Sequence, residues 1–505
     1  LSSLDYEGYA VAKRVFANDI AKKTTFDGAK RVSQVEHTNQ STSAVIGKYN
    51  YARLKTGHIK FEGYDHLNIG TVYDYDKLYR NKGAKRGVPE ADLSATKVYG
   101  DYATYASIKS YAFDAATNTQ STTTDGVTKY YNGNPFVGDN MNEITSFDGT
   151  SWSHDANGSR SDDGVVTVKY DGWNRVIEIR RKSDNVLIAT YTYDAENRRI
   201  KIDVGGTVTL LYYSGLDLVE ERNSSESVTA THVYGGEFID NIITSTRGGT
   251  RYWLHENQLF SIGHVTNNSA AFVERYGYDE RGVPTFYTGA GTDSTWNTSD
   301  DVTASTSAIG NTRLFQGREY DNWGPAPWYY FRNRFYDPQH ARFVTRDPIG
   351  NWGDPSQMGN AYGFALANPV NGMDPLGLDA PGHHWVIGRI RRMYKDTEIW
   401  YQFDQTTGPF PCQFQHIYDQ WHQVYNQHVE GLWEDWTYDR FMKKDPNWKP
   451  DQLKPKEAVE FREMLRNPTE AQKGKYGRDR LEYIRAFNEG MQNLASGKIK
   501  KIPCP

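Results

Sequence analysis

The feature that most constrains the fold of this chain is a short phrase that recurs along its first 287 residues. The phrase is degenerate: its pattern is an aromatic residue, Asp, a small or polar residue that is often Gly or Asn, and then Arg and an apolar residue. The copies are "TFDGAKRV" (25–32), "GYDHLNIG" (63–70), "VYDYDKLYR" (72–80), "SHDANGSR" (153–160), "KYDGWNRVIEIRR" (169–181), "YTYDAENRRIKI" (191–202) and "YGYDERGVPTFY" (276–287). The flanking residues alternate with period two, which predicts strands, and Asp with Gly or Asn predicts the turns between them. Units of about 20 residues would stack into one long wound sheet.

Composition supports many short strands. Aromatic residues make up 14% of the 505 residues, with 36 tyrosines and 45 glycines, which suits strands joined by tight turns. Two cysteines, Cys412 and Cys504, are too few to stabilise a chain of this size with disulfides. No apolar run approaches the roughly 18 residues of a membrane span. The net charge of −5 excludes neither an acidic nor a basic partner.

These phrases resemble the YD repeats of the Rhs polymorphic-toxin family. Residues 251–282 are similar to the repeat-associated stretch of that family, and residues 313–378 resemble its Rhs-associated core. The resemblance implies a mainly β fold, in which a spiral of YD-repeat strands forms a hollow shell or cocoon. It also implies three domains: a YD-repeat shell (1–250), an Rhs-associated core with a self-cleavage motif (251–378) and a small, mainly α toxin domain (379–505).

Two near-copies of a turn phrase, "RDPIG" (346–350) and "DPLGL" (374–378), close the repeat region. Proline fixes its own φ and forces the preceding Asp into an extended conformation, while the following Gly allows a sharp bend. Each phrase therefore presents a carboxylate on a rigid bend. Two such carboxylates brought together cannot both ionise cheaply, so the pair could act as acid and base on a water molecule. The alternative is a pair of turns that only plug the end of the shell.

The family resemblance assigns these carboxylates a role. Rhs cores resemble aspartyl proteases that cut their own chain after the final Leu of this motif. The two carboxylates would be Asp347 and Asp374, and the cut would fall between Leu378 and Asp379. Arg334, in "RFYDP", would orient the pair or balance its charge.

After residue 378 the repeats stop and helical patterns begin, over 414–442, 454–467 and 478–495. The intervening "NPTEAQKGKYG" (467–477) contains Pro468 and Gly474 and is predicted to break the helices. The Rhs architecture implies that this region is cargo, usually a toxin, held in the shell and released by the cut.

Histidine is enriched in this region, which holds five of the 13 in the chain: His383, His384, His416, His422 and His428. Imidazole serves as a metal ligand and as a general base near neutral pH. The layout resembles HNH, or His-Me finger, nucleases. That resemblance implies His384 as general base, with His383, His416 and His422 binding a divalent metal, Zn²⁺ or Mg²⁺, and DNA or RNA as substrate. The alternative is that these histidines are structural residues of an aromatic helix.

Two functions remain open. The leading hypothesis is an Rhs-type toxin of bacterial competition, made in the bacterial cytoplasm and secreted or delivered as an effector. An immunity protein and a secretion-system component would be its partners, besides its own cargo. We expect a processed or truncated fragment, because the chain starts without Met or a signal-peptide pattern. The alternative is a cell-surface adhesion scaffold with a non-enzymatic binding or plug domain.

One further stretch, "GTDSTWNTSDD" (291–301), clusters Asp293, Asp300 and Asp301 among small polar residues. Hard cations such as Ca²⁺ bind several oxygens, so a calcium site is one interpretation. The sequence favours the other, a solvated loop.

Overall fold

The computed structural model describes residues 3–7, 10–29, 31–134, 137, 141–235, 239–324, 327–349, 359–378, 433, 435–443, 454–466, 468–476 and 481. The chain divides into two compact units. The first comprises Leu1–Asn351 and Gln357–Leu378, and the second comprises Trp352–Ser356 and Asp379–Pro505.

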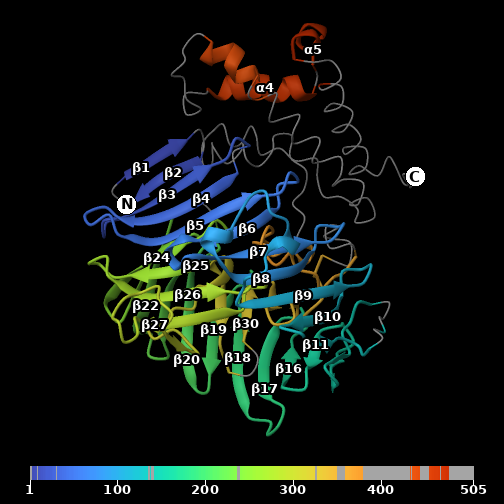
Figure 1. Cartoon of the computed structure of the whole chain (residues 1–505). Helices are drawn as coiled ribbons and strands as arrows, with labels where there is room; N and C mark the ends of the chain where they lie inside the picture. Colours follow the sequence, from blue (N-terminus) through green and yellow to red (C-terminus); the bar gives the residue numbers. More distant parts are fainter. Residues whose placement is uncertain are drawn as a thin grey trace. The chain divides into compact units, whose positions relative to one another are not determined.

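The first unit begins with an antiparallel sheet of eleven strands that pair in sequence order. Figure 1 shows most of them in blue. The strands are β1 (Ser3–Glu7), β2 (Ala10–Val15), β3 (Ile20–Phe26), β4 (Val32–Asn39), β5 (Val45–Arg53), β6 (Ile59–Tyr64), β7 (Ile69–Tyr75), β8 (Asn81–Pro89), β9 (Ser107–Phe113), β10 (Thr119–Thr124) and β11 (Val127–Tyr130). Three short 3₁₀ segments join them: η1 (Asp65–Leu67), η2 (Glu90–Asp92) and η3 (Tyr99–Asp101).

A second antiparallel sheet of fifteen strands comes next, again paired in sequence order. It contains β14 (Ser153–His154), β15 (Arg160–Asp162), β16 (Val166–Tyr170), β17 (Val176–Arg181), β18 (Leu187–Tyr193), β19 (Arg199–Val204), β20 (Thr207–Ser214), β21 (Asp217–Asn223), β22 (Val228–Tyr234), β23 (Ile242–Arg247), β24 (Thr250–Glu256), β25 (Ile262–Thr266), β26 (Phe272–Tyr278), β27 (Pro284–Gly289) and β28 (Val302–Ala304). A two-stranded ribbon, β12 (Ser146–Phe147) and β13 (Thr150–Ser151), precedes it.

A small four-stranded sheet ends the first unit. Its strands are β29 (Glu319–Asp321), β30 (Trp328–Phe331), β31 (Arg334–Asp337) and β32 (Arg342–Phe343), with the 3₁₀ segments η4 (Phe315–Gly317) and η6 (Ala365–Ala367) on either side. Every residue of β29 to β32 is buried. The predicted fold class, mainly β with strands wound in sequence order, is confirmed.

The repeated phrase forms one kind of turn. In the copy at Asp171, carboxylate Oδ1 accepts hydrogen bonds from the backbone N–H of Trp173 (2.9 Å) and Arg175 (3.0 Å). Oδ2 accepts from Arg175 Nε at 2.7 Å. Asn174, three residues after the Asp, takes the left-handed conformation at φ 60°, which Asn tolerates better than most residues. The copies at Asp76 and Asp194 repeat these bonds.

In several copies, the tyrosine of the Tyr-Asp pair ties its turn to the preceding hairpin. The Tyr193 hydroxyl donates to the Val176 carbonyl oxygen at 2.8 Å, about one repeat earlier in the chain. Tyr278 donates in the same way to Ile262 at 2.6 Å. Since a buried hydroxyl without a partner is costly, these bonds satisfy the polar end of a largely buried ring. The Tyr-Asp pairs in these copies are therefore structural.

The two large sheets contact one another through polar and apolar residues. Lys22 Nζ of β3 pairs with Glu256 Oε1 of β24 at 2.7 Å, and both side chains are buried. Figure 1 shows the blue strands of the first sheet above green strands of the second. A pocket of about 360 Å³ lies between them, lined among others by Glu62, Tyr64 and Arg275.

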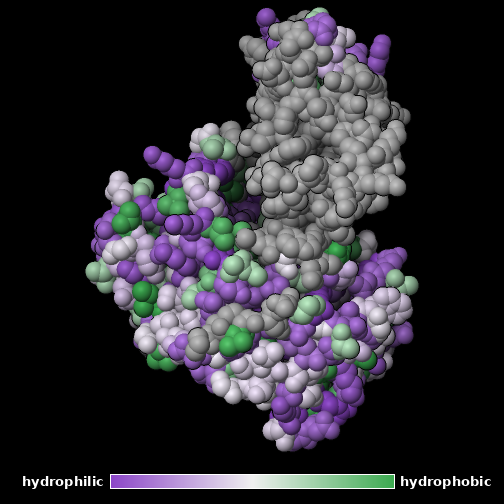
Figure 2. All heavy atoms as spheres, turned by 90° about the vertical axis from the view of Figure 1, so that its right-hand side faces the viewer, coloured by the Kyte–Doolittle hydropathy of each residue, from purple (hydrophilic) through white to green (hydrophobic). Residues whose placement is uncertain are grey.

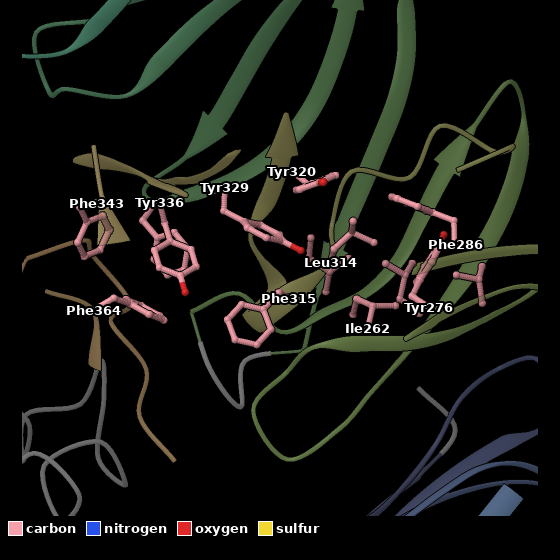
Figure 3. Close-up of a cluster of buried hydrophobic side chains, with 14 residues drawn as sticks. Ile262, Tyr276, Phe286, Leu314, Phe315, Tyr320, Tyr329, Tyr336, Phe343 and Phe364 are labelled. Carbon is pink, nitrogen blue, oxygen red and sulfur yellow. The ribbon is translucent and has the colours of Figure 1, made fainter. Parts of the chain in front are cut away.

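An apolar cluster joins the second sheet to the small one, as Figure 3 shows. Its buried members are Ile242, Leu254, Ile262, Val265, Tyr276, Phe286, Leu314, Phe315, Tyr320, Tyr329, Phe331, Tyr336, Phe343 and Phe364. The Tyr336 and Phe364 ring centroids are 4.3 Å apart, and Phe343 lies edge-on to Phe364 at 5.7 Å. The cluster thus supports the strands that carry the candidate site.

In the second unit the structure describes helical segments. α4 (Pro455–Arg466) matches the helix predicted over 454–467. A π-helical stretch, Tyr438–Met442, lies within the predicted 414–442. Trp433 packs edge-on to the Phe461 ring at 5.0 Å, and both side chains are buried.

One prediction for the second unit is wrong. The stretch 467–477 was expected to break the helices, yet α5 (Glu470–Tyr476) forms within it. The reason is a capping box. Thr469 Oγ1 accepts from the Gln472 N–H at 3.3 Å, while the Gln472 side chain accepts from the Thr469 N–H at 2.8 Å. These reciprocal bonds satisfy groups at the start of the helix.

On the face shown in Figure 2, the coloured residues are mostly hydrophilic, with hydrophobic ones scattered among them. Within the described ranges, no helix has both the length and the apolar character needed to cross a membrane.

Candidate functional site

The first Asp-Pro phrase places Asp347 just after the last strand of the small sheet. The Asp347 N–H donates to the Ala361 carbonyl at 2.9 Å, which fixes the backbone. Asp347 Oδ1 accepts from the Ile349 N–H at 3.0 Å, across the proline that follows it. This is the Asx bond by which short acidic side chains stabilise turns. This bond engages Oδ1, while the other carboxylate oxygen, Oδ2, faces Arg334.

The second phrase forms a bend at Asp374. Asp374 Oδ1 accepts from the Leu378 N–H at 3.0 Å, four residues ahead. Gly377 has φ +63°, and a Cβ added there would lie 2.4 Å from the Phe331 carbonyl oxygen. Only glycine fits this position without a shift of the backbone. The bend thus holds Leu378, the residue before the expected cut, against the Asp374 carboxylate.

Arg334, at the start of β31, joins the two phrases. Its Nη2 is 2.8 Å from Asp347 Oδ2 and 3.2 Å from Asp374 Oδ2. Its Nη1 donates to the Ala361 carbonyl at 3.0 Å and its Nε to the Gly377 carbonyl at 2.7 Å. The three residues singled out from the sequence are therefore brought together, although 40 positions separate Arg334 from Asp374.

The trio is shielded from solvent. Relative exposure is 3% for Arg334, 7% for Asp347 and 9% for Asp374. The Arg334 guanidinium lies over the Phe343 ring, 3.6 Å from its centroid, which adds a cation–π contact. Two carboxylates beside one guanidinium carry a net charge of −1 when both are ionised. One buried guanidinium therefore serves two buried carboxylates at this site.

Sequence reasoning missed part of this geometry. The Ala361 carbonyl, which contacts both Arg334 and Asp347, and the Phe343 ring were not anticipated. A backbone carbonyl leaves no mark in a sequence. The sequence offered one signal for the Phe343 ring: the Arg-Phe pair at 342–343 repeats the Arg-Phe pair at 334–335.

The predicted residues of the C-terminal domain, His383, His384, His416 and His422, lie outside the described residues, as does Asp379. Among the residues that the structure describes, no group of three or more His, Cys, Asp or Glu side chains is arranged to hold a metal ion. The metal site remains a prediction.

The acidic loop at 291–301 is held by hydrogen bonds of its own. Asp300 Oδ2 accepts from the Thr292 N–H at 2.7 Å and from the Thr292 hydroxyl at 2.8 Å. Asp300 Oδ1 accepts from the Thr298 hydroxyl at 2.7 Å. These bonds hold the pKa of Asp300 well below its usual value. Asp301 instead pairs with Arg275 at 2.6 Å. Asp300 therefore stabilises the loop itself, whereas Asp301 is buried against Arg275 of β26.

Comparison with known proteins relates the chain to toxins. It is 29% identical over 281 residues to the tRNA3(Ser)-specific nuclease WapA of Bacillus spizizenii, covering 55% of this chain and 11% of WapA. It is 39% identical over 67 residues to the toxin protein Tse5 of Pseudomonas aeruginosa, covering 13% of this chain and 5% of Tse5. The chain thus spans about a tenth or less of these relatives. No family model matches it.

The fold has a counterpart among solved structures. The Photorhabdus luminescens Tc holotoxin pore with a mutated TccC3 superposes with a TM-score of 0.57 at 16% sequence identity, covering 76% of this chain and 19% of that one. The WapA match is longer than residues 379–505, so it must include part of the β-shell. In its repeats, its strand order and these relatives, the chain is similar to Rhs-type, YD-repeat proteins of the polymorphic-toxin family.

Proposed function

We propose that this chain is an Rhs-type toxin whose shell holds residues 379–505 and frees them by cutting its own backbone between Leu378 and Asp379. The observation that carries the proposal is the contact of Arg334 with both Asp347 and Asp374 beside the Leu378 N–H. A buried pair of carboxylates next to the residue before the bond is the arrangement that acid–base hydrolysis requires.

The reaction balances with one shared proton. The ionised carboxylate takes a proton from a water molecule as the water oxygen attacks the Leu378 carbonyl carbon. The protonated carboxyl gives its proton to the Asp379 nitrogen as the C–N bond breaks. The products are a Leu378 carboxyl group and a free Asp379 amine, and the pair has exchanged its proton. Arg334 holds the two carboxylates and limits their mutual repulsion.

Exchange of one carboxylate tests the self-cleavage. The purified chain is expected to run as two pieces, residues 1–378 and 379–505, while Asp374→Asn and Asp347→Asn stay whole. Loss of the acid–base group should slow cleavage by about 10²- to 10⁴-fold. Asn retains an oxygen for the Leu378 N–H, so the bend itself survives. The control is Asp194→Asn in a repeat turn, which should be cut like the parent. An uncut parent chain, or a cut Asp374→Asn, would contradict the proposal.

We propose further that residues 379–505 are a metal-dependent nuclease of the HNH type. The support is the tRNA nuclease activity for which WapA is named and the histidines of this region. His384 would act as general base, and His383, His416 and His422 would hold Zn²⁺ or Mg²⁺. The metal would stabilise the charge that develops on a phosphodiester.

The nuclease is tested with the whole chain in bacterial cells and in solution. Its production should arrest growth, and the purified protein should degrade tRNA or plasmid DNA when Mg²⁺ or Zn²⁺ is added. His384→Ala should abolish both effects, whereas His428→Ala is the matched control in the same region. If neither nucleic acid is cut and growth is unaffected, this part of the proposal fails while the self-cleavage stands.

As an effector of this kind, the protein would be exported or delivered to a target cell. The partners of the proposal are its own cargo, a nucleic acid substrate, an immunity protein in the producing cell and a component of the secretion machinery. The toxin relatives support this proposal.

A further inference from the structure

The hairpin turn between β30 and β31 lies against the Asp374 bend. Phe331 pairs with Arg334, which leaves Arg332 and Asn333 as the two residues of the turn. Arg332 adopts φ 62°, a left-handed conformation that is unfavourable for a non-glycine residue. Such strain persists where surrounding contacts hold the residue in place.

Two arginines hold the first carbonyl of the bend. Arg332 Nη1 donates to the Pro375 carbonyl oxygen at 2.7 Å, and Arg318 Nη2 donates to the same oxygen at 2.5 Å. Both guanidinium groups also pair with Asp240, each at 2.8 Å. Burial lowers the pKa of Arg318 to about 10, and the charges of Asp240 and Asp374 oppose that effect. Asp240 thus aims two cationic donors at one carbonyl.

The next two carbonyls are held by the next two residues of the chain, Asn333 and Arg334. Asn333 Nδ2 donates to the Leu376 carbonyl oxygen at 3.0 Å. Asn333 is oriented in turn by Asn197 of a repeat turn, whose Nδ2 donates to Asn333 Oδ1 at 2.6 Å. Arg334 Nε then donates to the Gly377 carbonyl at 2.7 Å. Three successive carbonyls before Leu378 therefore meet three successive side chains.

We propose that Arg318, Arg332 and Asn333 form a main-chain clamp that positions the strand ahead of the bond to be cut. This inference rests on the self-cleavage proposed above. The clamp residues are positioning residues, because they hold the backbone at Pro375 and Leu376 and donate no proton to the reaction.

The geometry explains what the clamp contributes. Cleavage requires the Leu378 carbonyl to stay within reach of two buried carboxylates, and fixing a reactant in place lowers the entropic part of the barrier. The contacts fall on the backbone. The Leu376 side chain is 37% exposed although its carbonyl is held. The clamp therefore recognises the path of the chain and not the side chain at 376.

The sharpest test is Asn333→Asp, which keeps the size of the side chain and the oxygen that Asn197 contacts. At neutral pH it replaces the side-chain donor to the Leu376 carbonyl with a carboxylate, while the longer bond from the Asn333 backbone N–H, at 3.4 Å, remains. The rate constant of self-cleavage should fall about tenfold, the factor expected for one lost hydrogen bond. When the new carboxyl is protonated it can donate again, so the deficit relative to the parent should shrink as pH falls through about 4. A merely structural residue would not recover in this way.

The matched control is Asn157→Asp. Asn157 Nδ2 donates to Asn174 Oδ1 at 2.9 Å, in a contact between two repeat turns. It resembles the contact of Asn197 with Asn333 in joining two asparagine side chains. The same substitution there should leave cleavage at the parent rate at every pH. Thermal unfolding of both variants should occur within a few degrees of the parent.

A second variant guards against misfolding. Arg332→Gly removes the donor to Pro375 but suits the left-handed turn, so the hairpin should keep its shape. Cleavage should again slow about tenfold or more. Ala341→Gly is its control, because Ala341 also has positive φ in a hairpin turn, the one between β31 and β32.

The outcomes separate the two proposals. A parent chain that is never cut refutes the self-cleavage itself. A parent chain that is cut, together with folded Asn333→Asp and Arg332→Gly variants that are cut equally fast, refutes the clamp alone. Slower cleavage in both variants, with recovery of Asn333→Asp in acid, supports it.

Discussion

The Asp374 bend and the repeat turn at Asp194 share one backbone design. In both, Oδ1 of the Asp accepts the N–H four residues ahead, at 2.8 Å in the repeat turn and 3.0 Å in the bend. The residue three ahead has positive φ in both, as Asn197 and as Gly377. The candidate site is therefore a repeat turn in local structure, placed where a different environment surrounds its carboxylate.

The difference lies in what neutralises Oδ2. In the repeat turn, Arg198 of the same turn bonds Asp194 Oδ2 at 2.7 Å, with its side chain 27% exposed. In the bend, position four is Leu378, and the cation is the buried Arg334 from a distant strand. That Arg334 also holds a second carboxylate. The proposed self-cleavage would thus depend on replacing the turn's own counterion with a cation that is buried and shared between two carboxylates.

The largest difference in the free energy of unfolding should appear when glutamine replaces Arg334 of the bend or Arg198 of the repeat turn. Arg334→Gln leaves two buried carboxylates without their cation and should lower the free energy of unfolding by about 3–5 kcal/mol. Arg198→Gln should cost less than about 1 kcal/mol, as for other exposed pairs. Chemical denaturation of the two variants measures both values. Equal losses would show that the two turns are held in the same way.

The second-largest difference should appear when alanine replaces the residue of positive φ in the Asp374 bend and in a repeat turn. Gly377→Ala places a Cβ within 2.4 Å of the Phe331 carbonyl at φ +63°. It should cost about 1–3 kcal/mol and slow cleavage, because the bend must shift. Asn174→Ala, at φ 60° in a repeat turn, should cost about 1 kcal/mol without affecting cleavage. Unfolding curves and a gel-based cleavage time course test the pair.

Leu378→Arg converts the bend toward a repeat turn. An arginine four residues after Asp374 could bond its Oδ2, as Arg198 does with Asp194. It would compete with Arg334 for that oxygen, so cleavage should slow about tenfold while unfolding changes by less than about 1 kcal/mol. The control is Leu378→Met, which cannot form this bond. If Leu378→Arg is cut as fast as the parent, the cation beside Asp374 Oδ2 does not determine the cleavage rate.

The smallest effect should be the acid response of the repeat turns. Burial alone would raise the pKa of Asp194. Hydrogen bonds from the Arg198 backbone and side chain outweigh that effect and hold the pKa below its usual value. A lowered pKa in the folded state contributes stability above about pH 3.8 that is lost as pH falls through the folded value. The difference in unfolding free energy between the parent and Asp194→Asn should therefore shrink between pH 6 and pH 3. A constant difference would contradict the assignment.

Much of the shell could be anticipated because its information is local. Period-two alternation and the Asp-x-x-Asn/Gly phrase are properties of neighbouring residues, and the structure forms strands and turns at 169–181 and 191–202 as expected. α5 could also have been foreseen, since Thr469 and Gln472 stand at capping-box spacing. Pro468 and Gly474 pointed to a break in the helices, but the cap outweighs them.

The candidate site could be predicted only in part. Asp347, Asp374 and Arg334 were selected through motifs that resemble those of a family, and the fold brings them together. The clamp could not be foreseen, because every residue carries a carbonyl and no letter of the sequence marks the ones that are held. Arg332 and Asn333 are adjacent to Arg334, yet only the hairpin pairing of β30 and β31 reveals what they face.

The backbone grip on 375–377 has a practical consequence. All of the carbonyls that Arg318, Arg332, Asn333 and Arg334 hold in the bend precede Leu378. If the proposed self-cleavage depends on these contacts, it uses the main chain ahead of the cut and no side chain beyond it. Exchange of everything downstream, by recombination in nature or by cloning in the laboratory, would then leave the release step intact and give one container interchangeable contents.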